Sequence, residues 1–323
     1  MTSTILVTGG TGFIGSVIVR QLAEAGQKVR SGTRRTGQSV QSGAISVACD
    51  LDKPADLRLA TEGVAAVVHC AYGDEAAMAH QCANLLAAMT ENHVSRLVYF
   101  SSIAVYGESQ HPSLDAPIDP RELQGTYATG KAASELLIRA WADQHPGRHA
   151  IILRPGIVYG KGSPFWIDKL AERIRLGIWG DFGALAEGPA PLVHVDDVAA
   201  VTVAAVNLLE KSDIALAPVQ TFDVIGPETP RWNTYFHALA KAISVPPLKN
   251  VSRARLKWWQ LVAVPAKIWR RSGLQGNVRA ALAPAPGEMA IFSRYAHYDR
   301  TALEETLRLS PQVGLQEGLK RSF

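Results

Sequence analysis

The stretch Ile5-Leu-Val-Thr-Gly-Gly-Thr-Gly-Phe-Ile-Gly15 decides the fold class. It begins with apolar and β-branched residues typical of a buried strand and continues into glycines spaced as Gly9-x-x-Gly12-x-x-Gly15 at the start of a helical pattern. Glycines at this spacing let backbone N–H groups approach a pyrophosphate at the positive end of the helix dipole. Because they follow a strand and open a helix, they predict a dinucleotide-binding βαβ unit rather than an incidental glycine-rich turn.

Strand and helix patterns alternate through the first half of the chain. The expected strands are Thr4–Thr8, Lys28–Thr33, Ile45–Cys49, Ala65–Ala71, Arg96–Ser101 and Ala150–Leu153. The expected helices, with apolar residues three and four apart, are Gly12–Ala25, Lys53–Thr61, Glu75–Asn92 and Tyr127–Gln144. This alternation is typical of right-handed βαβ units, so we expect an α/β protein with a Rossmann-type doubly wound parallel sheet.

After Pro155 the regular alternation stops, and glycines and prolines become frequent up to Pro191. A further strand-and-helix pattern follows at Leu192–Leu209, and one more strand at Gln220–Ile225. The expected NADP-binding Rossmann domain comprises residues 1–155 and 192–225. The expected substrate-binding lobe, smaller and mostly helical, comprises residues 156–191 and 226–323, with helices broken at Pro265, Pro284 and Pro286.

The composition indicates an enzyme-sized chain without membrane spans. Its 323 residues, 47% of them apolar, suffice for a large core or two domains. No apolar run reaches the roughly 18–20 residues of a spanning helix, and the N-terminus reads as a strand rather than a leader, so we expect a cytoplasmic location. Cys49, Cys70 and Cys82 lack metal-ligand spacing, so we expect buried thiols in a reducing compartment and no metal site.

The end of the second expected strand indicates the cofactor. A site for NAD usually has an acidic residue there to bind the ribose hydroxyls, but this strand is followed by Arg34-Arg35. Guanidinium groups match the 2′-phosphate of NADP in charge and geometry. We therefore predict NADP, with NAD as the alternative, since two solvated loop arginines would also explain the pair. Asp50, after the third strand, is a candidate acceptor for the adenine amino group or an exposed turn residue.

Three residues are candidates for proton transfer. Ser102 lies at the end of the fifth expected strand, and Tyr127-Ala-Thr-Gly-Lys131 opens the following helix, so the tyrosine and lysine share one helix face. The ammonium and the positive charge of an oxidised nicotinamide favour the phenolate, and we expect them to lower the pKa of Tyr127 from its usual ~10. Ser102 would orient the substrate oxygen. The alternative is a chance pair on a surface helix.

Seven segments resemble, in order and spacing, the extended short-chain dehydrogenases/reductases, which are NAD-dependent epimerase/dehydratase-like enzymes. They are TGGTGFIG ending at Gly15, Cys49-Asp50-Leu51, VVHCA ending at Ala71, SSIAVYG from Ser101, Tyr127-x-x-x-Lys131, LRPGIVYG ending at Gly160 and VHVDDVA ending at Ala199. The resemblance covers the first two-thirds of the chain. It is highly specific for fold and cofactor and weakly informative about the substrate.

The resemblance implies a role for each matching residue. The glycine-rich segment would bind the pyrophosphate, Cys70 and Ala71 would line the adenosine and ribose path, and Ser101 and Pro155 would lie near the nicotinamide. The catalytic residues would be Ser102, Tyr127 and Lys131. The full set of expected cofactor-binding residues is Gly9, Thr11, Gly12, Phe13, Ile14, Gly15, Arg34, Arg35, Asp50, Leu51, Cys70, Ala71, Ser101, Tyr127, Lys131 and Pro155.

Departures from the family pattern narrow the reaction. Family dehydratases have an Asp-Glu pair directly after the catalytic hydroxyl residue, where this chain has Ile103 and Ala104, so sugar-nucleotide 4,6-dehydration is disfavoured. An asparagine usual in the helix before the fifth strand is replaced near Met78. We expect Asp196 or Asp197 to be the N-cap of the helix that follows.

Three functions remain open, in decreasing order of support. The first is an NADP(H)-dependent oxidoreductase that interconverts a ketone and a secondary alcohol by hydride transfer, with Tyr127 as proton donor and acceptor. The second is a sugar-nucleotide epimerase that retains its NAD(P). The third, a non-catalytic dinucleotide-sensing regulator, would not need Ser102, Tyr127 and Lys131 together. A homodimer paired through Glu75–Asn92 and the Tyr127 helix is expected, with an ordinary buried helix face as the alternative.

A basic, tryptophan-rich stretch from Lys249 to Arg279 remains to be explained. It contains eight Lys and Arg residues, three tryptophans and no acidic residue. We expect it to form a lid or wall of the substrate lobe that attracts a small-molecule substrate bearing a carboxylate, a phosphate or a bulky apolar group, and we expect no nucleic-acid partner. The alternatives are a solvated helix whose tryptophans pack on the core, and a membrane-surface helix.

Overall fold

A computed structural model describes residues 3–34, 43–211 and 216–271, together with 282–323. The chain forms two compact units, each assembled from three segments. Unit 1 comprises Met1–Gly156, Val195–Ile225 and Tyr298–Pro311. Unit 2 comprises Ile157–His194, Gly226–His297 and Gln312–Phe323.

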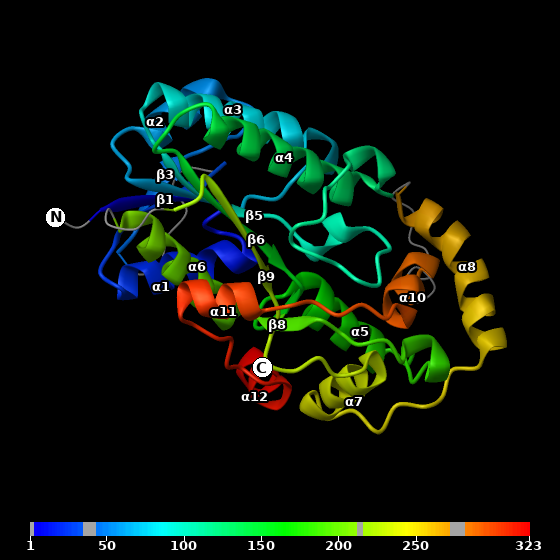
Figure 1. Ribbon diagram of the computed structural model, residues 1–323. Helices are drawn as coiled ribbons and strands as arrows, with labels where there is room; N and C mark the ends of the chain where they lie inside the picture. The colour runs from blue at the N-terminus through cyan, green and yellow to red at the C-terminus, as the bar shows by residue number, and fades with distance from the viewer. Residues whose placement is uncertain (1–2, 35–42, 212–215, 272–281) are drawn as a thin grey trace. The chain divides into compact units, whose positions relative to one another are not determined.

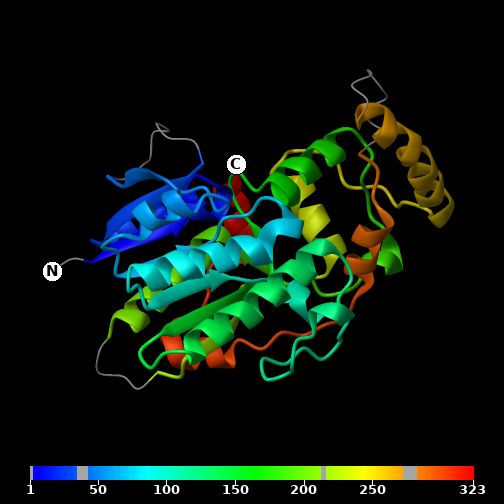
Figure 2. The same cartoon turned by 90° about the horizontal axis from the view of Figure 1, so that it is seen from above.

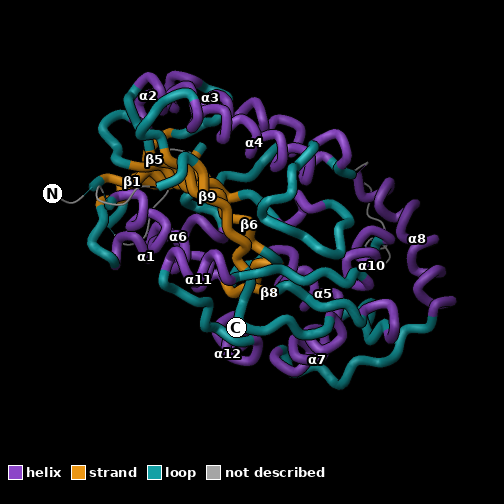
Figure 3. The backbone as a smooth tube through the Cα atoms, viewed as in Figure 1, coloured by secondary structure: helices purple, strands orange, loops and turns teal. Residues whose placement is uncertain are grey.

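Unit 1 contains a seven-stranded sheet in which every neighbouring pair is parallel. Its strands are β1 (Thr4–Thr8), β2 (Lys28–Thr33), β3 (Ile45–Ala48), β4 (Ala66–His69), β5 (Arg96–Phe100), β6 (His149–Pro155) and β9 (Val219–Val224). They lie in the order β3-β2-β1-β4-β5-β6-β9, and Figure 3 shows the strands in orange between helices. The order reverses between β1 and β4, so the carboxyl ends of these two strands define the crevice in which such sheets bind ligands. The predicted α/β class and doubly wound sheet are confirmed.

Helices cover both faces of this sheet (Figure 1). The helices on one face are α2 (Pro54–Thr61), α3 (Met78–Glu91) and α4 (Thr126–Asp143), and those on the other face are α1 (Phe13–Glu24), α6 (Val195–Glu210) and α11 (Thr301–Leu307). In the view from above, α3 (cyan) and α4 (green) lie side by side (Figure 2). Short turns of 3-10 helix lie at Glu75–Ala77, Ile103–Tyr106 and Pro120–Glu122.

The residues of β1 and α1 explain why both elements form. Ile5, Leu6 and Val7 of β1 are fully buried, because a central strand of a parallel sheet is covered on both faces. The buried residues of α1 are Gly15, Ile18, Val19 and Leu22, which recur three and four residues apart along one stripe of the helix. This stripe holds the helix against the sheet, so the glycine-rich turn between the two elements is fixed at both ends.

Unit 2 is mostly helical and has a different kind of core. Its regular elements are β7 (Ile157–Tyr159), a π-helical turn at Pro164–Lys169, α5 (Leu170–Arg175), a 3-10 turn at Gly183–Ala186, β8 (Leu192–His194), α7 (Trp232–Ala242), α8 (Arg253–Arg271), α10 (Pro286–Ser293) and α12 (Leu315–Ser322). Strands β7 and β8 form a separate parallel pair. Aromatic side chains fill the centre. The ring centres of Trp232 and Phe292 are separated by 4.7 Å, and those of Trp179 and Phe236 by 5.2 Å.

The structure differs from the sequence-based boundaries in three places. Residues 192–194 were predicted to belong with the large sheet, but they pair with β7 in unit 2. The prediction missed this pairing because the sequence showed no strand pattern at Ile157–Tyr159. Residues 298–311, predicted to belong to the lobe, lie in unit 1, where α11 packs on α6 and β9. The predicted break at Pro265 is wrong, since α8 continues to Arg271, whereas Pro286 begins α10, where its fixed φ suits the first helical turn.

Candidate functional site

The glycine-rich turn brings the carboxyl ends of β1 and β4 close together. Gly9 has a φ of +67°, and a Cβ on it would lie 2.7 Å from the Cα of Ala71. A Cβ on Gly15 would lie 2.2 Å from the backbone oxygen of Gly9. The N-cap residue of α1 is Gly12, which has no side chain to cover the N–H groups of the first turn. Only glycine fits at positions 9 and 15, and the turn leaves the helix N-terminus accessible to an anion.

The expected adenosine side of the site has one exposed cation and one carboxylate that already has partners within its own turn. Arg34 follows β2 directly and is exposed, whereas Arg35 lies outside the described residues. Asp50 follows β3; its Oδ2 lies 3.3 Å from Nζ of Lys53, and its Oδ1 accepts from the backbone N–H of Asp52. The adjacent Leu51 is buried. Asp50 is therefore held by its own turn with an acceptor facing partly outward.

Cys70 and Ala71 are tied to β1 after the end of β4. The thiol of Cys70 donates to the backbone oxygen of Thr8 at 3.0 Å, and the N–H of Ala71 donates to the hydroxyl of Thr8 at 3.3 Å. Burial raises the pKa of Cys70 to about 12, and it does the same for Cys49 and Cys82. All three cysteines are free thiols, although Cys70 is only half-buried, and their raised pKa values make them poor nucleophiles.

Ser102, Tyr127 and Lys131 come together at the carboxyl end of β5. Ser102 begins the 3-10 turn after this strand, and Tyr127 and Lys131 lie one turn apart near the start of α4. The side chain of Ser102 lies near enough to the hydroxyl of Tyr127 to lower its pKa. Lys131 is buried, and its Nζ donates to the backbone oxygen of Phe100 at 2.6 Å and lies 5.9 Å from the centre of the Tyr127 ring. The lysine therefore fixes the strand end against the helix that presents the tyrosine.

Burial controls the protonation of this group. Desolvation raises the pKa of Tyr127, the side chain of Ser102 lowers it, and the carboxylate of Glu75 raises it. Desolvation also lowers the pKa of Lys131 to about 8. Lys131, which was expected to lower the pKa of Tyr127 together with an oxidised nicotinamide, directs its ammonium at the carbonyl of Phe100, and among the groups of the chain desolvation dominates and raises that pKa. The phenol is consequently protonated at neutral pH.

Residues that the sequence analysis did not single out surround Tyr127. Tyr72 packs edge-on against its ring, with the two ring centres 5.7 Å apart. The carboxylate of Glu75 accepts hydrogen bonds from the hydroxyls of Tyr72 and Thr126, and these bonds lower the pKa of Glu75. Met78, near which the usual asparagine is replaced, is buried. A Cβ added to Gly130 would lie 3.1 Å from the Cβ of Met78. The contact between α3 and α4 is apolar at this point.

A buried polar network begins behind the catalytic candidates. The hydroxyl of Ser101 donates to Oε1 of Glu135 at 2.5 Å. Arg154 pairs with both carboxylate oxygens of Glu135, through Nε at 3.0 Å and Nη2 at 2.7 Å. Its Nη1 donates to the hydroxyl of Tyr106 at 2.9 Å, and that hydroxyl donates to Oδ1 of Asp223 at 2.8 Å. The network joins β5, α4, β6 and β9, and so holds the edge of the sheet next to Ser102.

The same network perturbs one carboxyl group strongly. Burial raises the pKa of Asp223 to about 6, although the hydrogen bond from Tyr106 and the charge of Arg154 act in the opposite direction. The sequence held a signal for part of this network: Glu135 lies four residues after Lys131, which lies four after Tyr127, so all three share one helix face. The side chains of Arg154 and Asp223 reach it from the ends of separate strands, which no spacing reveals.

The remaining candidates are placed as follows. Pro155 is the last residue of β6 and is buried. Ile103 is buried and Ala104 donates its N–H to the hydroxyl of Ser102 at 3.2 Å, so the positions of the dehydratase Asp-Glu pair are apolar here. The predicted N-cap role is wrong, because α6 begins at Val195 and both aspartates lie within its first turn, where Asp196 accepts from Arg20 at 3.3 Å.

Comparison with known proteins identifies the family. The sequence model of the NAD dependent epimerase/dehydratase family matches residues 5–215. The chain belongs to this family. This member of the epimerase/dehydratase family is accordingly an enzyme of the extended short-chain dehydrogenase/reductase type that uses a nicotinamide dinucleotide and acts on CH–OH and C=O groups.

Relatives of this family member include both reductases and epimerases. It is 34% identical to a 2-alkyl-3-oxoalkanoate reductase of Stenotrophomonas maltophilia over 188 residues, which are 54% of the chain and 56% of that reductase. It is 25% identical to the UDP-glucose 4-epimerase of Vibrio cholerae, covering all of the chain and 95% of the epimerase. The crystal structure of Thermus thermophilus UDP-glucose 4-epimerase with NAD is similar over 99% of the chain and 97% of the epimerase, with a TM-score of 0.71 and 23% identity, which shows the shared fold.

Proposed function

We propose that this enzyme is an NADP(H)-dependent reductase that interconverts a ketone and a secondary alcohol, with Tyr127 as the proton donor and acceptor. The observation that carries the proposal is the grouping of Ser102, Tyr127 and Lys131 at the carboxyl end of β5, where burial raises the pKa of Tyr127 and keeps the phenol protonated at neutral pH. A protonated phenol is the form needed to donate to the oxygen of a ketone as it becomes an alkoxide. The substrate oxygen would accept from both hydroxyls.

The residues of unit 1 fit a dinucleotide. The turn from Gly9 to Gly15 offers close backbone approach at the N-terminus of α1, and Asp50 offers an acceptor after β3. Arg34, exposed after β2, would bind the 2′-phosphate of NADP. When bound, the nicotinamide supplies or accepts the hydride at the carbonyl carbon. The side chains of the protein would carry out the proton transfer.

The side chains of the chain would divide the proton transfer between them. Tyr127 would donate its proton to the substrate oxygen, and Ser102 would hold that oxygen by a second hydrogen bond. Lys131, whose pKa of about 8 keeps it largely cationic at neutral pH, would stabilise the phenolate left behind. Its bond to the carbonyl of Phe100 positions α4, and Ser101 is positioned by Glu135.

One observation disfavours dehydration, and the names of two relatives favour a ketone on a largely hydrocarbon molecule, with or without a carboxylate, as the substrate. Ile103 and Ala104 make the segment after Ser102 apolar, which does not suit the acid–base chemistry of dehydration. The relative at 34% identity acts on a 2-alkyl-3-oxoalkanoate, and another relative, of Arabidopsis thaliana, is a 3beta-hydroxysteroid-dehydrogenase/decarboxylase at 24% identity. Both names contain a 3-oxo or 3-hydroxy group on a largely hydrocarbon molecule. We propose that unit 1 binds the dinucleotide and that unit 2 supplies most contacts to this substrate.

The second candidate is a sugar-nucleotide epimerase. It is favoured by the match to a UDP-glucose 4-epimerase, which covers all of the chain, whereas the match to the reductase covers 54% of it. An epimerase would retain its dinucleotide through purification and catalyse no net oxidation, whereas a reductase would exchange the dinucleotide and consume NADPH with a ketone. A homodimer through α3 and α4 is proposed for either, since Leu136 of α4 is 44% exposed.

The test combines cofactor binding with turnover. Fluorescence titration should show tighter binding of NADPH than of NADH, and Arg34→Ala should weaken NADPH alone, by about 1.5–3 kcal/mol. A panel of 3-oxo acids, 3-oxosteroids and UDP-sugars should identify a ketone that is reduced. Tyr127→Phe should lower turnover by about 10²–10⁴-fold while the dinucleotide still binds. Tyr72→Phe, which keeps the ring contact, should cost less than about tenfold. Epimerised UDP-sugar without net NADPH consumption would establish the second candidate instead.

A further inference from the structure

Charge is distributed unevenly along this chain. Between Glu228 and Glu288 there is no acidic residue, and the same segment carries ten Lys and Arg residues. The net charge of the whole chain is only +4, so the residues outside the segment are net negative. The cations are concentrated around α8, and the proposed reaction assigns them no role.

One face of α8 belongs to the core of unit 2. Leu256, Trp259 and Ala263 are buried in its apolar cluster and lie three and seven residues apart from the first, along one stripe of the helix. This face accounts for one of the two adjacent tryptophans. The alternative in which the tryptophans of this stretch pack on the core thus holds for Trp259 but not for Trp258, which is 60% exposed, so the opposite face of the helix needs its own explanation.

The opposite face is an apolar stripe exposed to solvent. Ala254, Trp258 and Leu261 lie at spacings of four and seven residues, about 180° around the helix from the buried stripe at 100° per residue. The side chain of Trp258 is 60% exposed and that of Leu261 is 73% exposed. Two large apolar side chains on one solvent-facing stripe are the feature that marks an interaction surface.

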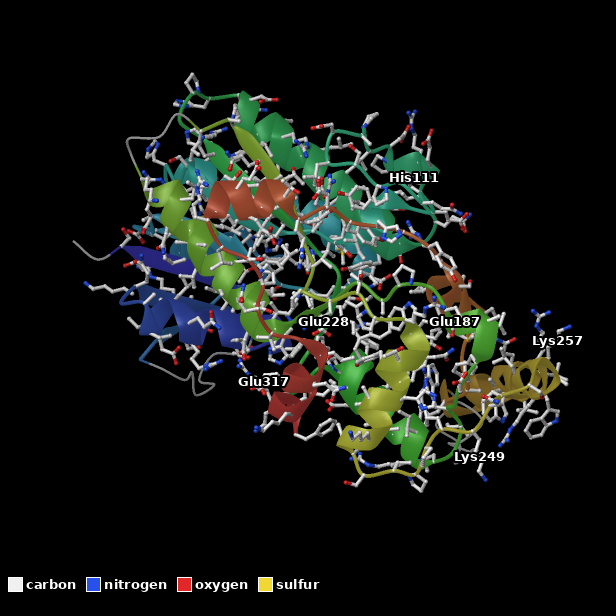
Figure 4. The ribbon with its side chains drawn as sticks, turned by 60° about the horizontal axis from the view of Figure 1, so that its bottom comes forward. His111, Glu187, Glu228, Lys249, Lys257 and Glu317 are labelled. Atoms are coloured by element: carbon white, nitrogen blue, oxygen red, sulfur yellow. The ribbon has the colours of Figure 1, made fainter. Side chains whose placement is uncertain are left out.

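Cations flank this stripe on both sides. Arg253 and Lys257, four residues apart and both exposed, form one edge. Arg255 forms the other edge, with its guanidinium 4.9 Å from the centre of the Trp259 ring. Lys249 lies just before the helix, and the side chains of Lys249 and Lys257 point away from the ribbon (Figure 4). Long basic side chains at the edges of an apolar stripe extend past it and leave its centre open to an apolar medium.

We propose that the outer face of α8 binds the surface of an anionic lipid bilayer, with the helix lying in the plane of the interface. Trp258 and Leu261 would enter the boundary of the acyl chains, where tryptophan is favoured, and the flanking cations would contact the phosphates of the headgroups. No helix among the described residues is long and apolar enough to span a membrane, so the contact is peripheral. The proposal concerns this surface and does not rest on the reaction.

The charge pattern favours lipid over two other occupants. A second copy of the chain packed stripe against stripe would bring two sets of the same cations together, which costs free energy. A nucleic acid would engage the cations but would leave Trp258 and Leu261 without an apolar partner, because a duplex presents phosphates rather than hydrocarbon. An anionic bilayer satisfies both parts of the pattern.

Co-sedimentation of the full chain with vesicles tests the proposal. Vesicles of phosphatidylcholine with phosphatidylglycerol should bind the chain, pure phosphatidylcholine should bind it weakly, and high salt should weaken the charged contact. Leu261→Ser and Trp258→Ser should each lower partitioning on the order of tenfold. Leu59→Ser is the matched control, since Leu59 on α2 is 70% exposed but has no place in the stripe, and it should bind as the unchanged chain does.

Substitution of basic residues by glutamine provides a second test of the proposal. Arg253→Gln with Lys257→Gln should reduce binding to anionic vesicles by about tenfold or more. Lys28→Gln with Lys211→Gln removes the same charge from unit 1 and should leave binding unchanged. Thermal melts of every variant identify any that has lost its fold. Equal binding to both vesicle types, capture only by duplex DNA, or concentration-dependent self-association that Leu261→Ser abolishes would each overturn the proposal.

Discussion

Unit 1 contains a buried polar network beside its catalytic candidates, whereas the centre of unit 2 is filled by aromatic rings. In unit 1 the carboxylate of Glu135 and the guanidinium of Arg154 are fully buried and pair with each other, with the hydroxyls of Ser101 and Tyr106 as further partners and Nη2 of Arg139 3.8 Å from the carboxylate. In unit 2 the centre is a cluster of aromatic rings, of which Trp232, Phe236 and Phe292 have no exposed surface. Hydrogen bonds are directional and fix atoms at set distances, whereas ring packing tolerates many arrangements of similar volume.

This difference indicates how each unit serves the reaction. The unit that must place Ser102 next to Tyr127 uses a network in which every distance is fixed, because a proton moves only across a short, well-aligned contact. The proposed substrate lobe uses packing that accepts substitution. Four measurements would test this difference between the two units.

Arg154→Met should have the largest effect on stability. It leaves the carboxylate of Glu135 buried without its main partner, which typically costs about 3–5 kcal/mol. Urea unfolding measures the loss, and the double variant with Glu135→Leu should recover much of it because the unpaired charge at Glu135 is removed. Arg121→Ala, in an exposed pair with Asp119, is the control and should leave stability unchanged. A single variant as stable as the original chain would contradict the role of the pair.

Trp232→Ala should lower stability by a similar or slightly smaller amount, about 3–5 kcal/mol, because it leaves a cavity among the rings. Trp232→Phe should cost less, since it keeps most of the volume. Both losses should be the same near pH ~5 and pH ~8 because the neighbouring rings carry no charge there. A loss that changed with pH would mean that the aromatic core depends on a titrating group.

Asp223→Asn should remove a pH dependence from unit 1. The pKa of Asp223 is raised by burial to about 6, above its usual value, so the folded chain binds its proton more tightly than the unfolded chain does. Stability is therefore lost as pH rises from about 4 to about 6, by roughly 2–3 kcal/mol at most. The asparagine keeps an acceptor for Tyr106 and should flatten this part of the profile of Tm against pH. An unchanged profile would exclude Asp223 as its source.

Glu75→Gln should have the smallest effect, confined to the pH dependence of turnover. The carboxylate of Glu75 helps to raise the pKa of Tyr127, so its removal should move the basic limb of the pH–rate profile slightly to lower pH, since Glu75 is only half-buried and its charge is screened by solvent. Asp115→Asn, an exposed acid in the loop before α4, is the matched control. A shift to higher pH would have the wrong sign for a charge effect.

The sequence predicted those features that depend on local pattern. The bounds of β1 and β2 were correct because β-branched and apolar runs stop at glycines and polar turns, and the placement of Tyr127 and Lys131 one turn apart near the start of a helix was also correct. Strands β7 and β8 were not recognised as a pair, because three residues are too few to show alternation. The raised pKa of Tyr127 depends on burial by residues distant in sequence, which no motif encodes.

The connectivity of the two units has a consequence for how this enzyme can change over evolutionary time. The chain passes between unit 1 and unit 2 five times, after residues 156, 194, 225, 297 and 311. A lobe made of three separate segments cannot be exchanged between genes as a single cassette, nor can one proteolytic cut release it. New substrate preferences must therefore arise by point substitution and by small insertions in place, while the nucleotide-binding half stays attached through every intermediate.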